Sequence, residues 1–127
     1  MLRNDHTAFR VRDLDRALDF YTGILGMRFL FRETDEAHGE AFAYLELEGG
    51  NLELLQSLDG AMPPVAEPRP PYTPHLAIAT DDLVALATVL GEKHVPILKG
   101  PMTIPGKVTW LYIADPDNNV LEVVQWL

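Results

Sequence analysis

Alternating apolar and polar residues recur along the whole chain and predict a protein built largely of β-strands. A period of two indicates strands with one buried face, and clusters of Gly, Pro, Asn and Asp separate the segments. The clearest turn is DPDNN at 115–119. The predicted strands lie near 6–11, 27–34, 41–48, 51–57, 75–80, 94–99, 107–114 and 119–126.

Two segments change to helical spacing, each directly after the first strand of its half of the chain. Asp13 can cap the first helix and Gly26 ends it, whereas Asp81 or Asp82 caps the second and Gly91 ends that one. The apolar positions that recur at helical spacing are Leu14, Ala17, Leu18, Tyr21 and Leu25 in the first helix, and Leu83, Leu86, Ala87 and Leu90 in the second.

The order of predicted elements is the same in both halves, strand–helix–strand–strand–strand. A shift of 69 residues places His6 on His75, and Glu53 follows His6 by 47 residues, as Glu122 follows His75. We therefore predict an α+β fold of two βαβββ modules within one domain. Module 1 spans 1–58, a connector with six prolines spans 59–74, and module 2 spans 75–127.

Composition narrows the classes of partner. The formal charge is −9, from 19 acidic and 10 basic residues. Such a surface repels phosphate backbones and anionic lipids, so we expect neither nucleic-acid nor membrane binding. The chain has no apolar run near the roughly 20 residues that span a bilayer. Cysteine is absent, which excludes a disulfide framework and a thiol nucleophile and fits a cytoplasmic protein.

Two histidines and two glutamates stand at matching places in the predicted modules. His6 and His75 begin the first strand of each module, and Glu53 and Glu122 lie on the last. Any one of them alone would be read as a structural or surface residue, but the same pair recurs at the same interval. A carboxylate among apolar neighbours takes up a proton unless a cation accompanies it. We therefore predict that these four side chains bind one divalent metal ion, since imidazole and carboxylate suit nickel, cobalt, zinc, iron or manganese.

Four segments carry a resemblance to a known family. HTAFRVRDLDRALDFYTGILGMRF, NLELL, PHLAIATDDL and IADPDNNVLEVVQ resemble, in order, the segments typical of glyoxalase I (lactoylglutathione lyase), a branch of the vicinal oxygen chelate (VOC), or glyoxalase–bleomycin resistance–dioxygenase, superfamily. The turn has Asn118 where the family has glycine, a tolerable change because asparagine adopts positive φ. The resemblance covers nearly the whole chain and implies the VOC fold, with curved mixed sheets forming a metal-containing cleft.

The resemblance also implies roles for individual residues. The metal ligands of the family fall on His6, Glu53, His75 and Glu122, with Ni²⁺ or Co²⁺ favoured and Zn²⁺ an alternative. The glutathione-binding arginine is matched by Arg10, ~13 Å from His6 along the same strand face. A guanidinium there can hold a substrate carboxylate. A family asparagine that helps hold glutathione is replaced by Ser57.

The implied activity is that of a lyase acting on a small thiol-derived substrate. The hemithioacetal of a 2-oxoaldehyde such as methylglyoxal is converted, through an enediolate, into a 2-hydroxyacyl thioester. By resemblance, Glu122 is the catalytic base, and Glu53 is a ligand that can also carry the proton. The paired modules of this family often come from two chains, so we expect a homodimer.

Three alternatives remain at this point. Extradiol dioxygenases and fosfomycin-modifying enzymes use two His and one Glu, which leaves Glu53 without a role. An epimerase resembling methylmalonyl-CoA epimerase also abstracts a proton beside a carbonyl, and Lys99 and Lys107 could serve its CoA group. A non-catalytic drug-binding protein of the bleomycin-resistance type would suit the acidic charge, Trp110 and Trp126.

Overall fold

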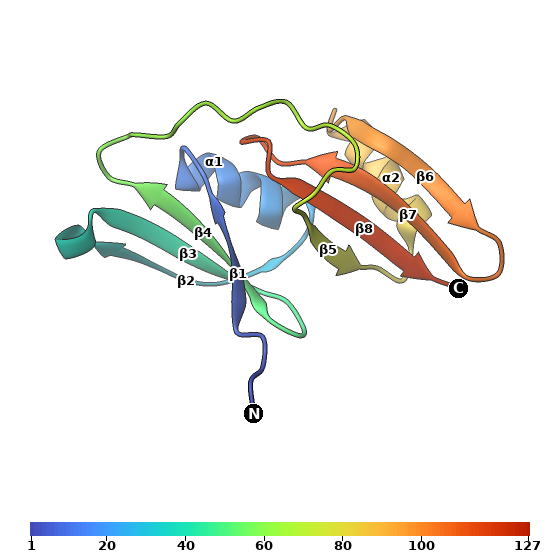
Figure 1. Cartoon of the computed structure of the whole chain (residues 1–127), viewed down its shortest axis with the longest axis horizontal. Coiled ribbons are helices and arrows are strands. Elements are labelled where there is room, and N and C mark those ends of the chain that lie inside the picture. Colours follow the sequence, from blue (N-terminus) through green and yellow to red (C-terminus); the bar gives the residue numbers. More distant parts are fainter. The chain divides into compact units, whose positions relative to one another are not determined.

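Each half of the chain forms one four-stranded mixed β-sheet, as the computed structural model of residues 1–127 shows (Figure 1). The chain divides into two compact units, Met1–Val65 and Ala66–Leu127. Unit 1 contains β1 (His6–Arg10), α1 (Leu14–Leu18), the π-helix η1 (Asp19–Ile24), β2 (Arg28–Asp35), the 3₁₀-helix η2 (Glu36–His38), β3 (Glu40–Glu46) and β4 (Asn51–Ser57). Unit 2 contains β5 (Leu76–Ala79), α2 (Leu83–Glu92), β6 (Ile97–Ile104), β7 (Val108–Ala114) and β8 (Val120–Trp126).

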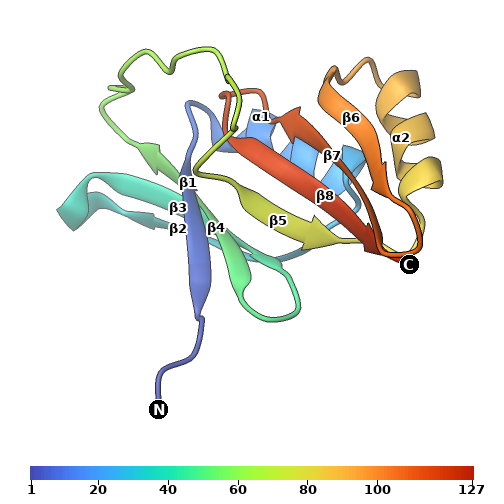
Figure 2. The ribbon, with the colours of Figure 1, turned by 45° about the vertical axis from the view of Figure 1, so that its right-hand side comes forward.

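The two sheets share one topology. Their strand orders are β1-β4-β3-β2 and β5-β8-β7-β6. The first and last strands of each unit, β1 with β4 and β5 with β8, pair in parallel (Figure 2). All other neighbours are antiparallel. The prediction of two βαβββ modules is therefore confirmed, and this topology brings the beginning and the end of each module side by side.

One face of each sheet is the hydrophobic core. Leu52 and Leu54 of β4 are buried, and so are Leu121 and Val123 of β8. Because successive side chains of a strand point to opposite faces, Glu53 emerges on the face opposite Leu52 and Leu54. The same alternation places Glu122 opposite Leu121 and Val123.

The helices pack on the core faces, α1 against β3 and β4 and α2 against β8. A glutamine near the end of the last strand fixes each helix start: Gln56 Oε1 accepts from Leu14 N at 2.8 Å, and Gln125 Oε1 accepts from Leu83 N at 2.9 Å. Asp13 caps α1, as predicted. These matching contacts tie each helix to its sheet.

The predicted helix after Asp13 changes type along its length. The α-helical part ends at Leu18, and a π-helix follows, in which Leu25 N donates to Phe20 O at 3.1 Å. Both Phe20 and Tyr21 are buried, with ring centroids 5.0 Å apart. The wider turn accommodates two consecutive aromatic side chains in the core, a change that apolar spacing alone does not indicate.

A further difference concerns residues 100 and 101, which lie between the strands predicted near 94–99 and 107–114. Strand β6 continues through them, with irregular register on both sides of Lys99. Gly100 has φ +103°, and a Cβ there would lie 2.8 Å from Trp110 O. Glycine and an irregular register thus let the strand pass close to β7 where proline would otherwise end the pairing.

The turn predicted at 115–119 joins β7 to β8. The buried Asp115 carboxylate accepts from the backbone N–H groups of Asp117 and Asn119 at 2.9 and 2.8 Å. Asn118 has φ +64°, the conformation for which the family uses glycine. No helix of the structure is long and apolar enough to cross a bilayer.

Candidate metal centre

His6 and Glu53 meet on the outer face of the first sheet. Ala8 is paired with Glu53 across β1 and β4, so His6, two residues earlier, lies on the same face as the carboxylate. His6 Nε2 is 3.7 Å from Glu53 Oε1. The Glu53 side chain is 13% exposed and that of His6 is 35% exposed. The small side chain of Ala8 leaves the space between them open.

His75 and Glu122 form the matching pair in unit 2. Ala77 is paired with Glu122 across β5 and β8, as Ala8 is with Glu53. His75 Nε2 lies 2.8 Å from Glu122 Oε2, and both side chains are 19% exposed. The structure therefore brings the four predicted ligands together as two pairs, one in each unit. Neither unit by itself gathers three or more side chains that could hold a metal ion.

Each histidine is oriented through its other ring nitrogen. His75 Nδ1 lies 2.9 Å from the Tyr72 carbonyl oxygen. A carbonyl only accepts hydrogen bonds, so Nδ1 is the nitrogen that donates to it, and Nε2 is the ring nitrogen that faces Glu122. Two electron-rich atoms facing each other at 2.8 Å need a proton or a metal cation between them. The His75–Glu122 pair therefore fits a divalent ion, and the carbonyl contact is typical of metal-binding histidines.

His6 has a charged partner at the corresponding nitrogen. Its Nδ1 lies 2.6 Å from Asp5 Oδ2. A carboxylate that accepts from Nδ1 leaves Nε2 directed toward Glu53 as a ligand atom. The two histidines thus present the same nitrogen to their glutamates, although a side chain supports one and the backbone supports the other.

A tyrosine lies beside each His–Glu pair. Neither of these two tyrosines was predicted from the sequence as a site residue. Tyr44 of β3 is the cross-strand partner of Glu53, and Tyr112 of β7 is that of Glu122. Each ring meets its histidine edge-on, with centroids 5.4 Å apart. The only signal in the sequence was a tyrosine on the third strand of each module. The strand register is needed to show that its neighbour is the glutamate.

Burial raises the pKa of Tyr44, and its hydrogen bond to Glu53 and the negative charges of Glu53 and Asp5 raise this pKa further. The phenol therefore stays protonated at neutral pH and serves as a hydrogen-bond donor to the Glu53 carboxylate. A carboxylate held in this way has fewer orientations open to it.

The predicted substrate residues lie farther along the same face of unit 1. Arg10 ends β1 and pairs with Leu55, two residues beyond Glu53, and Ser57 ends β4 opposite Glu40. Both are thus displaced from the His6–Glu53 pair toward one end of the sheet. The other two histidines of the chain, His38 and His94, are exposed.

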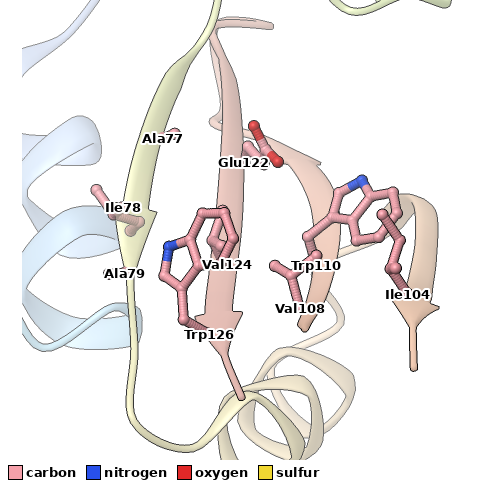
Figure 3. A pocket seen from close by; sticks show the side chains of 9 residues that line it. All are labelled: Ala77, Ile78, Ala79, Ile104, Val108, Trp110, Glu122, Val124 and Trp126. Atoms are coloured by element: carbon pink, nitrogen blue, oxygen red, sulfur yellow. The ribbon is translucent and has the colours of Figure 1, made fainter. Parts of the chain in front are cut away.

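A cavity of about 400 Å³ lies on the outer face of unit 2 (Figure 3). Glu122 is one of its wall residues, and the indoles of Trp110 and Trp126 project from β7 and β8 beside Val124. The lining residues are Ala77, Ile78, Ala79, Ile104, Val108, Trp110, Glu122, Val124 and Trp126. Glu122 is the only ionisable side chain among them.

Comparison with known proteins identifies the relatives of this chain. It is 29% identical over 127 residues to the uncharacterized protein YwbC of Bacillus subtilis, covering 97% of both chains. It is 29% identical over 125 residues to a probable lactoylglutathione lyase of Vibrio cholerae, covering 94% of this chain and 88% of the relative.

Solved structures show the same fold. The trypanothione-dependent glyoxalase I of Leishmania major matches with a TM-score of 0.78 and 26% identity, covering 98% of this chain and 87% of that one. A glyoxylase/bleomycin resistance protein/dioxygenase domain from Frankia sp. EAN1pec matches with a TM-score of 0.79 and 26% identity. The match covers 100% of this chain and 93% of that domain.

The family assignment follows from the sequence as a whole. The sequence pattern of one superfamily, which includes enzymes, matches residues 3–123. This chain therefore belongs to the Glyoxalase/Bleomycin resistance protein/Dioxygenase superfamily.

Proposed function

We propose that this protein is a metal-dependent, glyoxalase I-like lyase that converts the hemithioacetal of a 2-oxoaldehyde and a thiol into a 2-hydroxyacyl thioester. The observation that carries the proposal is the duplicated pair, one histidine Nε2 facing one glutamate carboxylate in each of two matching units. Relatives named lactoylglutathione lyase, 26–29% identical to this chain, support the reaction class.

The four ligands would hold one divalent ion when the His6–Glu53 and His75–Glu122 pairs join, within one chain or across a homodimer. Two imidazoles and two carboxylates suit Ni²⁺ or Co²⁺, with Zn²⁺ as an alternative. Such an ion supplies Lewis-acid stabilisation to two adjacent substrate oxygens. Proton transfer and substrate binding would depend on the side chains of this protein.

Glu122 is the residue we propose as the catalytic base. Its carboxylate borders the cavity of unit 2, where substrate carbon atoms would lie. It would take the proton from the carbon that bears sulfur and return it to the neighbouring carbon, so that the reaction is an isomerisation with no net gain or loss of atoms. Glu53, which accepts the Tyr44 hydrogen bond, is better suited to remain a ligand.

Arg10 and Ser57 would hold the thiol cosubstrate. A guanidinium binds a carboxylate through two parallel hydrogen bonds, and glutathione carries two carboxylates. Arg10 lies on the face of the His6–Glu53 pair, at the end of its strand. This position would keep the charged end of the substrate away from the reacting carbon.

The deciding experiment combines metal analysis with turnover. The protein is stripped of metal, reconstituted in turn with nickel, cobalt, zinc and manganese, and assayed with methylglyoxal and glutathione for thioester formation. We expect about one metal ion for every two His–Glu pairs, that is, one ion per chain. We also expect turnover with at least one of the metals. Bound metal without thioester formation by any reconstituted form would overturn the proposed reaction.

The cavity favours a second candidate, a non-catalytic protein of the bleomycin-resistance type that binds a cationic drug in an acidic, aromatic-lined groove. Two indoles beside an apolar wall suit such a ligand. A protein of that kind has no need of metal. Purified protein that holds no metal, even after dialysis against nickel or cobalt, and that binds bleomycin tightly would favour this candidate.

A further inference from the structure

Tyr72, the only aromatic residue of the connector 59–74, has an uncommon backbone conformation three residues before His75. Its φ is +60°, in the left-handed region that residues with a Cβ atom avoid. Its N–H donates to Arg69 O at 2.8 Å, which closes a turn. A conformation of this kind persists only where the surrounding structure holds it, and it is often found at functional sites. The contacts of Tyr72 therefore indicate what holds the turn and what the turn does.

The ring of Tyr72 is anchored on the sheet of unit 2. It packs on the ring of Tyr112 of β7, with centroids 4.9 Å apart and an interplanar angle of 34°. Tyr112 in turn meets His75 edge-on and is the cross-strand partner of Glu122. Aromatic pairs at such separations attract each other beyond the apolar area that they bury. The connector is thus attached to the same tyrosine that flanks the His75–Glu122 pair.

The carbonyl group of Tyr72 faces the histidine. Its oxygen lies 2.9 Å from His75 Nδ1, and His75 Nε2 lies 2.8 Å from Glu122 Oε2. Pro71 and Pro74 flank the short segment between ring and histidine, and the fixed φ of proline limits the other conformations open to it. One residue therefore combines a ring contact with Tyr112 and a backbone contact with the imidazole.

Unit 1 supports its histidine in a different way. The residue before His6 is Asp5, whose Oδ2 lies 2.6 Å from His6 Nδ1. In the repeat of 69 residues, Asp5 corresponds to Pro74, which has no side-chain acceptor. Unit 2 has no carboxylate at this place in the sequence, and the carbonyl of Tyr72 is the acceptor for its histidine.

We propose that Tyr72 is a positioning residue for His75. Its ring, packed on Tyr112, holds the backbone in the left-handed conformation that directs the carbonyl oxygen to Nδ1, so that Nε2 stays directed toward Glu122. The proposal rests on the proposed function in one respect, because only there is His75 a metal ligand. The connector is then a part of the metal centre as well as a link between the units.

Three substitutions at Tyr72 separate the ring from the backbone. Tyr72→Phe keeps the ring and is the matched control. Tyr72→Gly removes the ring but adopts positive φ without steric cost. Tyr72→Ala removes the ring and keeps the Cβ atom that disfavours this φ. Positioning through the backbone therefore predicts a larger effect in Tyr72→Ala than in Tyr72→Gly, whereas a role in packing alone predicts that Tyr72→Gly is at least as damaging.

The first readout is the proton on His75 Nδ1 in the metal-free protein. The ¹⁵N shifts of both ring nitrogens are measured through the carbon-bound ring protons at about pH 8, above the ordinary titration range of imidazole. In the parent protein and in Tyr72→Phe, His75 Nδ1 should have the shift of a protonated nitrogen. In Tyr72→Ala it should move toward that of an unprotonated nitrogen, because the ring can then adopt its other tautomer, and in Tyr72→Gly it should move less. His6 Nδ1, beside Asp5, should be unchanged in every variant.

The second readout is metal affinity, measured by chelator competition with nickel or cobalt. Tyr72→Ala should bind the metal about tenfold more weakly, as is typical when a metal-binding histidine loses the contact that orients it. Tyr72→Phe should bind as the parent does. An unchanged His75 Nδ1 shift in Tyr72→Ala, or an effect of Tyr72→Gly as large as that of Tyr72→Ala, would overturn the proposal.

Two results separate this inference from the proposed function. Nδ1 shifts that follow the expected order, in a protein that binds no metal, would support the positioning role and refute the metal centre. Equal metal affinities of the parent and Tyr72→Ala would refute the positioning role and leave the metal centre intact.

Discussion

Replacing Glu122 with glutamine tests the metal centre through protein stability, independently of turnover. A metal that binds only the folded protein adds RT ln(1 + [M]/Kd), or about 2.7 kcal/mol at 100 times the dissociation constant. For 127 residues, with an unfolding entropy of about 2.1 cal/mol/K per residue, this corresponds to an increase in melting temperature of roughly 10 °C. We expect that increase for the parent protein.

Glu122→Gln should remove most of this increase, because it replaces one of two anionic ligands by a neutral amide. If the affinity falls about a hundredfold, the same metal concentration equals the new dissociation constant and adds only about 0.4 kcal/mol, or roughly 1.5 °C. The metal-free variant should stay folded, because the new amide can donate to His75 Nε2, which lies 2.8 Å from a carboxylate oxygen in the parent protein.

The assay is thermal unfolding followed by circular dichroism, with and without nickel or cobalt. Glu92→Gln, which changes an exposed carboxylate at the end of α2, serves as the matched control and should keep the full increase. The same Glu122→Gln protein should be folded and without turnover. A variant that retains the full metal-induced stabilisation would refute Glu122 as a ligand, and one with undiminished turnover would refute it as the base.

Three further predictions follow from the contacts around the centre. Tyr44→Phe removes the hydrogen bond to Glu53 and should lower metal affinity about tenfold in a chelator competition, whereas equal losses in Tyr44→Phe and Tyr112→Phe would show that this hydrogen bond is not the cause. Arg10→Ala should raise KM for the glutathione adduct about tenfold with little change in kcat, and a loss confined to kcat would contradict its role in binding. Gln56→Ala and Gln125→Ala should each lower the free energy of unfolding by about 1 kcal/mol in urea titrations, because each leaves the first backbone N–H of a helix without its acceptor; a change in neither would show that water replaces these contacts.

The sequence predicted the tandem βαβββ fold because period-two alternation indicates strands with one buried face and the repeat spacing indicates two equivalent units. Glu53 and Glu122 could be recognised as equivalent residues because of the repeat spacing. Cross-strand register is a different kind of information, fixed by turns and bulges far from the residue in question. Tyr44 and Tyr112 therefore became visible as neighbours of the glutamates only in the structure.

Where the structure differs locally from the predicted elements, the physical cause can be identified. Gly100 and the following proline look like a loop to any pattern of turn residues, yet the close approach to Trp110 O allows the strand to continue. The π-helix after Leu18 depends on how Phe20 and Tyr21 pack, which apolar spacing does not encode. Trp110 and Trp126 were recognised as aromatic residues suited to a ligand, but their shared cavity required the pairing of β7 with β8.

The parallel pairing of β1 with β4 gives a bound cation a mechanical role. Between Arg10, where β1 ends, and Asn51, where β4 begins, the chain forms α1, η1, β2, η2 and β3, so this pairing closes a long loop of its unit. An ion bound by His6 of β1 and Glu53 of β4 would link these two strands. Binding by His75 and Glu122 would link β5 to β8 in the same way. Loss of the ion should therefore speed amide exchange first in β1 and β5, the edge strands that carry or follow the histidines, while the central strands stay protected.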